Sequence, residues 1–158
     1  MQEFDFIEFI NSFNRLGIRY LLIGGQAAIQ YGAPVFTFDF DLWIHPDDRK
    51  KVIEYLEKED FEIDSESPKK QPIVKAYCGE ERIDLFFAKT FVNRKGRKIS
   101  FDDCFTTAVI KYEPKGVFYI RLCPIKELIE LKNMREPDIK DKEQIKYLKE
   151  AMNEERKR

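Results

Sequence analysis

Hydrophobic and polar positions along this chain repeat with two different periods, and each period predicts a different kind of element. Apolar residues recur every three positions from Phe4 to Phe13, which predicts an amphipathic helix over residues 3–16. The apolar run RYLLI (19–23) predicts a short buried strand. The two-residue alternation in FTFDFDLWI (36–44) predicts a second strand.

Similar signals divide the rest of the chain into helices and paired strands. Proline and acidic residues mark helix starts, and glycine turns separate apolar runs. The predicted helices are 26–31, 46–59, 124–134 and 140–158, and the predicted β-hairpins join 72–78 to 82–88 and 108–112 to 117–122. This order of elements predicts an α+β fold, in which a mixed α/β sheet carries flanking helices and a C-terminal helical segment.

The length and composition are those of a small globular protein. A chain of 158 residues suits one buried core, so we interpret 1–158 as a single domain with 124–158 as its C-terminal helices. Hydrophobic residues make up 43% and charged residues 36%, which excludes a disordered chain. Fourteen Phe and seven Tyr supply large groups for the core.

Charge and cysteine content limit the possible partners and the cellular compartment. A formal net charge of -1 excludes a global basic field that would draw the chain to nucleic acid or membrane, although it leaves a local basic patch open. The apolar runs are too short to span a bilayer, and the N-terminus lacks a signal peptide's positive region. Three widely spaced cysteines form no disulfide framework. We therefore expect a cytoplasmic protein with no membrane partner.

Two aspartates in the second predicted strand carry the first chemical signal. Because side chains alternate along a strand, Asp39 and Asp41 project from one face, about 6.6 Å apart along the chain. Phe38, Phe40 and Leu42 then take the other face, toward the core. Paired carboxylates repel each other and are costly to bury, and a divalent cation removes that penalty. Mg²⁺ favours carboxylate oxygens and keeps positions open for phosphate oxygens.

A third carboxylate extends this set. Asp84 lies between hydrophobic residues on a later predicted strand, within RIDLFF (82–87). Three acids can hold two metal ions about 3.5–4 Å apart, the arrangement used for in-line phosphoryl or nucleotidyl transfer. We predict that Asp39, Asp41 and Asp84 bind Mg²⁺ or Mn²⁺.

A pair of glycines adds a phosphate-binding element. Gly24 and Gly25 follow a predicted buried strand and precede a predicted short helix. Glycines let backbone N–H groups approach a phosphate closely, and a helix N-terminus adds partial positive charge. One end of the sheet would thus offer a phosphate cradle beside a metal site.

These elements together resemble the DNA polymerase β-like nucleotidyltransferase superfamily. The shared pattern is hydrophobic-Gly-Gly, then Asp-hydrophobic-Asp about fourteen residues later, then a hydrophobic-Asp-hydrophobic strand. The spacing is similar to that of minimal bacterial and archaeal nucleotidyltransferases, including the AbiEii type of toxin–antitoxin pairs. Their basic C-terminal region resembles 128–148, through Lys132, Arg135, Lys140 and Asp141.

The chain also departs from the family pattern. Many relatives carry an arginine four residues before the first aspartate, and Val35 stands there in this chain. The threonine two residues before that aspartate is present, as Thr37. A second acid that is common in the tail falls near Gln144.

The resemblance implies a nucleotidyltransferase fold and a metal-dependent reaction. A nucleoside monophosphate would pass from an NTP to a hydroxyl acceptor, which is RNA, a protein or a small molecule, and pyrophosphate would leave. Asp39 and Asp41 would bind both metal ions, and Asp84 would bind one and help deprotonate the acceptor. The residues that it assigns to nucleotide binding are Gly24, Gly25, Thr37 and Lys132.

Simpler interpretations stay open for each element taken alone. Two glycines form tight turns more often than phosphate loops. Asp39 and Asp41 alone fit a solvated strand face, or the Asp-x-Asp motif of glycosyltransferases, which need a larger nucleotide-binding domain. Lys132 fits a solvated helix face as well as a phosphate contact. His45, the only histidine, fits a strand-end residue better than a substrate contact.

A second function class competes with the enzyme. The same fold could serve as a non-catalytic module that binds a nucleotide or a partner protein, for instance as half of a toxin–antitoxin pair. The carboxylate set favours the enzyme, whereas Val35 and the small size favour the module. A homo-oligomer or a partner would supply the acceptor surface in either case.

Overall fold

The computed structural model describes residues 3–64, 72–114, 116 and 118–157. The strands are β1 (Tyr20–Ile23), β2 (Phe40–Ile44), β3 (Glu62–Ile63), β4 (Ile73–Cys78), β5 (Glu81–Phe87), β6 (Thr90–Val92), β7 (Lys98–Ser100), β8 (Val109–Tyr112) and β9 (Tyr119–Leu122). The helices are α1 (Phe6–Arg15), α2 (Gly24–Gln30), the 3-10 helix η1 (Pro46–Asp48), α3 (Arg49–Lys58), α4 (Phe101–Thr106), α5 (Ile125–Lys132) and α6 (Ile139–Arg156).

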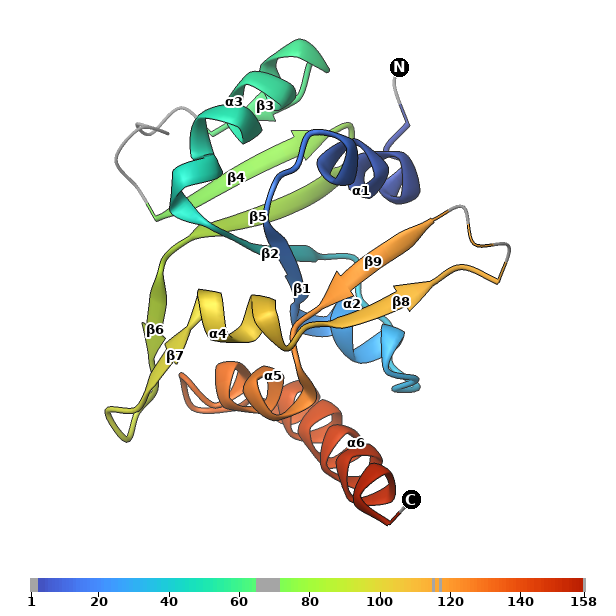
Figure 1. Cartoon of the computed structure of the whole chain (residues 1–158), viewed down its shortest axis with the longest axis vertical. Helices are drawn as coiled ribbons and strands as arrows, with labels where there is room; N and C mark the ends of the chain where they lie inside the picture. The colour runs from blue at the N-terminus through green and yellow to red at the C-terminus, as the bar shows by residue number, and fades with distance from the viewer. Residues whose placement is uncertain (1–2, 65–71, 115, 117, 158) are drawn as a thin grey trace.

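A mixed sheet forms the centre of the molecule. Among the described residues it has seven strands in the order β3-β4-β5-β2-β1-β9-β8, and β6 and β7 form a separate hairpin. In Figure 1, α1 and α3 lie at one end of the molecule, whereas α5 and α6 lie together at the other. The predicted α+β fold with a mixed sheet, flanking helices and C-terminal helices is confirmed.

The middle strands are buried on both faces. All four residues of β1 are buried, and so are Leu42, Trp43 and Ile44 in succession on β2. Trp43 is fully buried, and its Nε1 donates a hydrogen bond to the Ala88 carbonyl at 2.8 Å. These strands therefore form a rigid base for the residues at their ends.

The predicted N-terminal helix is confirmed, although it begins later than expected. Asp5 caps α1 by accepting a hydrogen bond from the Glu8 N–H at 3.2 Å, so the helix starts at Phe6. Phe9, Ile10 and Phe13 are buried against the sheet side of the core. No helix in the described ranges is both long and apolar enough to cross a lipid bilayer.

The strand predicted over 36–44 is shorter than expected. β2 begins at Phe40, and Asp39 precedes it. Phe36 and Phe38 are 72% and 70% exposed, and their ring centroids lie 4.7 Å apart, so the prediction that Phe38 faces the core is wrong. The physical reason is the lack of a β1 partner, because β1 pairs with β2 only as far as Ile23 opposite Asp41, after which the chain enters α2.

Both predicted hairpins are confirmed. β4 pairs antiparallel with β5, and β8 pairs antiparallel with β9. Lys115 and Val117 of the second turn lie outside the described residues, as does Arg158 at the end of the last predicted helix. The pattern missed β3, the β6–β7 hairpin and α4, because each is too short to show a period.

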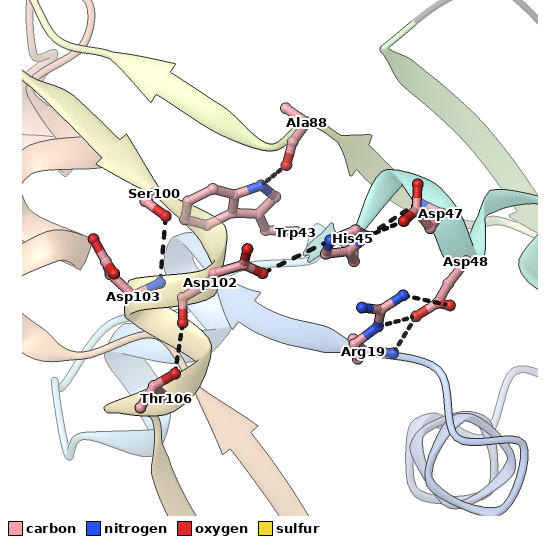
Figure 2. Close-up of polar contacts among 10 residues, drawn as sticks. All are labelled: Arg19, Trp43, His45, Asp47, Asp48, Ala88, Ser100, Asp102, Asp103 and Thr106. Carbon is pink, nitrogen blue, oxygen red and sulfur yellow. Dashed lines mark hydrogen bonds and ion pairs between the residues drawn. The ribbon is translucent and has the colours of Figure 1, made fainter.

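His45 follows Ile44, the last residue of β2, so it lies at the other end of this strand from the aspartates. Figure 2 shows its polar contacts. Its Nδ1 accepts a hydrogen bond from the Asp47 N–H at 3.1 Å, and its Nε2 lies 3.7 Å from an Asp102 carboxylate oxygen on α4. Beside it, Asp48 accepts hydrogen bonds from the backbone and side chain of Arg19 at 2.9–3.1 Å. This cluster joins the start of β1 to η1, and it supports the interpretation of His45 as a strand-end residue.

The Arg19–Asp48 pair gives a test of the fold. Burial would raise the pKa of Asp48, but the hydrogen bonds from Arg19 outweigh burial and lower it. A lowered pKa contributes stability above the unfolded-state value of about 3.9, and this stability is lost as the pH falls. Asp48→Asn should therefore reduce the free energy of unfolding at pH 7 by about 1–3 kcal/mol. Denaturant titration should show this loss shrinking toward pH 3, and an equal loss at both pH values would contradict the assignment. Asp47→Asn, at an exposed carboxylate, is the matched control.

Candidate active site

Strand pairing brings the predicted site residues of three segments to one place in the sheet. Asp41 lies opposite Ile23, the last residue of β1, and beside Asp84 on the parallel strand β5. Neighbouring strands lie about 4.8 Å apart, so Asp41 and Asp84 are close neighbours on one face. Gly24 follows Ile23 directly and begins α2.

A pocket of about 710 Å³ opens over this point. All of the predicted site residues line it, from both the sheet and the C-terminal helices. They are Gly24, Gly25, Thr37, Asp39, Asp41, Asp84 and Lys132. The structure thus brings the predicted residues together, while their roles stay predictions. His45 is not among the residues that line the pocket.

The two glycines are required by contacts with other site residues. Gly24 has a φ of +71°, and a Cβ there would overlap Asp41 Oδ2. A Cβ on Gly25 would lie 2.9 Å from Thr37 Cγ2. Ile23, the N-cap of α2, makes no side-chain hydrogen bond, so no side chain caps the first N–H groups of this helix. The glycines therefore let Asp41 and Thr37 lie directly against the start of α2.

Thr37 also organises the loop that holds Asp39. Its Oγ1 accepts a hydrogen bond from the Asp39 N–H at 3.2 Å, and its carbonyl accepts one from Gln26 Nε2 on α2 at 3.3 Å. The Asp39 side chain is 56% exposed. Although Asp39 lies outside β2, these contacts hold it at the pocket.

Burial and mutual repulsion act on the pKa values of the pocket carboxylates. Burial raises the pKa of Asp41 to about 6, and repulsion from Asp84 and Asp39 adds to this effect, whereas Lys132 and Arg82 oppose it. Burial also raises the pKa of Asp84, against the opposing charges of Arg82 and Lys75. A cation bound here would relieve both effects.

Sequence reasoning missed Arg82, which lies between the acids. Its Nε lies 3.2 Å from Asp84 Oδ1, and its Nη2 lies 3.9 Å from Asp39 Oδ1. Over the part of the chain that the structure describes, no three His, Cys, Asp or Glu side chains are arranged to hold a metal ion. Instead a guanidinium bridges Asp39 and Asp84. The two-residue spacing of Arg82 and Asp84 on one strand could have indicated it.

Lys132 lies within the pocket rather than on a solvated helix face. Its Nζ donates a hydrogen bond to Gln144 Oε1, and Gln144 is 2% exposed. Burial lowers the pKa of Lys132, whereas the nearby carboxylates of Asp141 and Asp41 raise it. Gln144, which stands near a common family acid, is therefore the residue that positions this lysine. Its contact with a triphosphate stays a prediction.

The other residues that line the pocket are mostly apolar or charged. The apolar residues are Ile23, Phe86, Phe91, Leu128, Leu131 and Met134. Phe91 comes from the unpredicted β6–β7 hairpin, which ion pairs join to the C-terminal segment. Arg97 contacts Glu130 of α5 at 2.5 Å, and Arg94 contacts Glu136 at 2.8 Å. The charged residues at the rim include Arg135, Lys140 and Asp141.

The raised pKa of Asp41 predicts that, without metal, the free energy of unfolding falls as the pH rises. A carboxyl whose folded-state pKa is raised contributes stability below its unfolded value of about 3.9, and that stability is lost as the pH rises through about 6. In EDTA, Asp41→Asn should therefore be more stable than the parent at pH 7.5, by up to about 3 kcal/mol. Denaturant titration should show the difference shrinking near pH 4. Asp39→Asn, at an exposed acid, should change less, and a less stable Asp41→Asn at every pH would contradict the electrostatic account.

The contact between Gly24 and Asp41 can be tested by adding one methyl group. Gly24→Ala forces a side chain into a positive φ, which costs about 1 kcal/mol, and also pushes Asp41 away. Gly96→Ala is the matched control, because Gly96 has a φ of +81° with open space around it. We expect Gly24→Ala to lose more unfolding free energy than Gly96→Ala, and adding Asp41→Ala to recover part of the excess. Equal losses in the two glycine variants would show that the close approach is unimportant.

Comparisons with known proteins identify structures with a similar fold. No family model matches the sequence, and no curated protein matches it. The lincosamide antibiotic adenylyltransferase LnuA in its lincomycin-bound form has a similar structure, with a TM-score of 0.69 and 17% identity over 92% of this chain and 95% of that chain.

Two further solved structures are also similar. The antibiotic-resistance factor ANT(2'')-Ia superposes with a TM-score of 0.61 and 14% identity, over 94% of this chain and 82% of that one. TM1012 of Thermotoga maritima, assigned as a nucleotidyltransferase, gives a TM-score of 0.52 and 12% identity, over 94% of this chain and 93% of that chain. The mixed sheet and its flanking helices match these structures, so this chain has the nucleotidyltransferase fold.

Proposed function

We propose that this chain is a metal-dependent nucleotidyltransferase, which moves a nucleoside monophosphate from an NTP to a hydroxyl acceptor and releases pyrophosphate. The observation that carries the proposal is the meeting of Asp39, Asp41 and Asp84 with Gly24 and Lys132 in one pocket. The fold shared with known nucleotidyltransferases supports it.

The donor set suits a hard divalent cation. Asp41 and Asp84 have raised pKa values because they are buried near other acids, and Asp84 Oδ1 is buried without a hydrogen-bond partner. Mg²⁺ and Mn²⁺ prefer such oxygen ligands and leave positions for phosphate oxygens. Asp39, Asp41 and Asp84 would hold the metal, which when bound neutralises phosphate charge during the transfer.

The other side chains position the nucleotide and the acceptor. Lys132, fixed by Gln144, offers a cation to the triphosphate, and the N–H groups that begin α2 at Gly24 and Gly25 offer donors. The acceptor oxygen forms a bond to the α-phosphorus as the bond to the pyrophosphate oxygen breaks. Asp84 helps to take the acceptor proton, a role that a carboxyl of raised pKa suits. Positioning and charge stabilisation supply most of the rate.

Two observations favour different classes of acceptor. LnuA acts on lincosamide antibiotics, which favours a small-molecule hydroxyl. The resemblance to the AbiEii type favours RNA or a protein within a toxin–antitoxin pair instead. The small size of this chain does not count against catalysis, because the chain covers 95% of LnuA, an adenylyltransferase. A homo-oligomer or a partner protein would complete the acceptor surface.

A non-catalytic module with the same fold is the second candidate. Val35 replaces the arginine that many relatives carry, and Arg82 pairs with two of the three acids. Both observations suit a protein that binds a nucleotide or a partner without turning over. Transfer activity separates the two candidates.

The test compares the parent with Asp84→Asn in transfer of label from each α-labelled NTP, with Mg²⁺ or Mn²⁺, to a cell extract and to small hydroxyl compounds. Because Asp84 acts on the acceptor oxygen, its loss should lower turnover by about 100-fold or more and change nucleotide affinity little. Asp103→Asn, at an exposed acid on α4 outside the pocket, is the matched control. A parent that binds NTP but labels nothing under all these conditions would establish the binding module.

A further inference from the structure

We propose that Arg82 is the built-in counter-ion of the carboxylate set, and that a divalent cation must displace its guanidinium to bind Asp39 and Asp84. The inference rests on the proposed function, because that function requires the cation. It adds a positioning residue that controls when the cation can bind.

The contacts of Arg82 follow from its place on β5. Arg82 and Asp84 are two residues apart on one strand, so their side chains leave the same face. The Nε and Nη2 atoms of Arg82 lie 3.2 and 3.3 Å from the two oxygens of Asp84. Nη2 also lies 3.9 Å from Asp39 Oδ1, on the loop before β2. One planar guanidinium therefore serves two acids from different segments.

Arg82 occupies the space in which a shared metal ion would lie. The guanidinium contacts both oxygens of Asp84 and one oxygen of Asp39, so a cation held by the two acids together would compete with it for the Asp84 oxygens. Lys132 adds positive charge toward Asp41 but donates its hydrogen bond to Gln144, so it does not compete for these oxygens. Arg82 is thus the cationic side chain that a metal ion would have to replace at this pair of acids.

The contact between Arg82 and Asp84 can readily be exchanged for a contact between Asp84 and a metal ion. Arg82 Nε and Asp84 Oδ1 are both buried, yet neither makes a hydrogen bond of good geometry despite their 3.2 Å separation. The Arg82 side chain as a whole is 41% exposed and lines the pocket, so the guanidinium can move without crossing the core. A metal ion would give Asp84 Oδ1 a full ligand bond in place of a poor contact.

This arrangement couples metal binding to nucleotide binding. Metal alone must separate Arg82 from its two acids and leave the guanidinium without an anion. A triphosphate in the same pocket supplies that anion, so metal and NTP should bind more tightly together than apart. Arg82 would then keep the carboxylates neutralised until nucleotide arrives.

Mn²⁺ affinity without nucleotide, measured by electron paramagnetic resonance, tests the proposal. Arg82→Gln removes the competing charge, so it should bind Mn²⁺ about tenfold more tightly than the parent. Adding ATP should then increase Mn²⁺ affinity less in this variant than in the parent. Arg135→Gln is the matched control: it removes a charge from the same pocket, at a residue that pairs with Asp141, and should change Mn²⁺ affinity by less than about twofold.

Thermal unfolding in EDTA and in Mn²⁺ provides a second readout. Arg82→Gln should be less heat-stable than the parent in EDTA and gain more from Mn²⁺, because the metal replaces the missing counter-ion. Arg82→Lys keeps the charge without the planar fork and should give intermediate Mn²⁺ affinity, which guards against a poorly folded glutamine variant.

The outcomes distinguish this inference from the proposed function. Equal Mn²⁺ affinity in the parent, Arg82→Gln and Arg82→Lys would overturn the inference even if the parent transfers nucleotides. Absence of Mn²⁺ binding in all three would overturn it as well. Tighter binding by Arg82→Gln without any transfer by the parent would uphold the counter-ion role and reject the catalytic function.

Discussion

Mutual repulsion among three carboxylates at one end of the central sheet is the constraint on which the rest of the site depends. Asp41 and Asp84 are register partners on adjacent strands, and Asp39 lies beside them. Burial of such a set is unfavourable unless positive charge compensates it. Burial raises the pKa of Asp41, and repulsion from Asp84 and Asp39 adds to this effect despite the opposing charges of Lys132 and Arg82. Buried carboxylates with raised pKa values distinguish this pocket from an ordinary polar surface.

The surrounding elements fit this constraint. Buried β1 and β2 fix Asp41 against Gly24, where no side chain could fit. The C-terminal helices bring Lys132 and Gln144 over the same point. The strands therefore position one of the carboxylates, and the helices add a cationic side chain near them. Under the proposed function, this arrangement would favour binding of a divalent cation together with an anionic nucleotide.

The contacts of Arg82 bear on both candidate functions, the enzyme and the binding module. The guanidinium of Arg82 contacts both Asp39 and Asp84. Under the proposed counter-ion role, the same contact would oppose metal binding, and catalysis would depend on how readily it is exchanged. The similarity to LnuA over nearly the whole of both chains supports the shared fold.

The sequence by itself determined the main elements and identified candidate residues that line one pocket. Period-two and helical spacing are local properties, so β1, α1 and both long hairpins could be predicted, and the Gly-Gly, Asp-x-Asp and Asp84 positions followed from their residue types. Only the tertiary structure decided that β2 starts at Phe40 and that Phe36 and Phe38 are exposed, because a strand requires a partner and β1 ends at Ile23. It also decided the roles of Arg82 and Gln144. Although the spacing of Arg82 and Asp84 is local, the contacts with Asp39 and Lys132 join residues 43 and 12 positions apart in the chain, which the local pattern does not show.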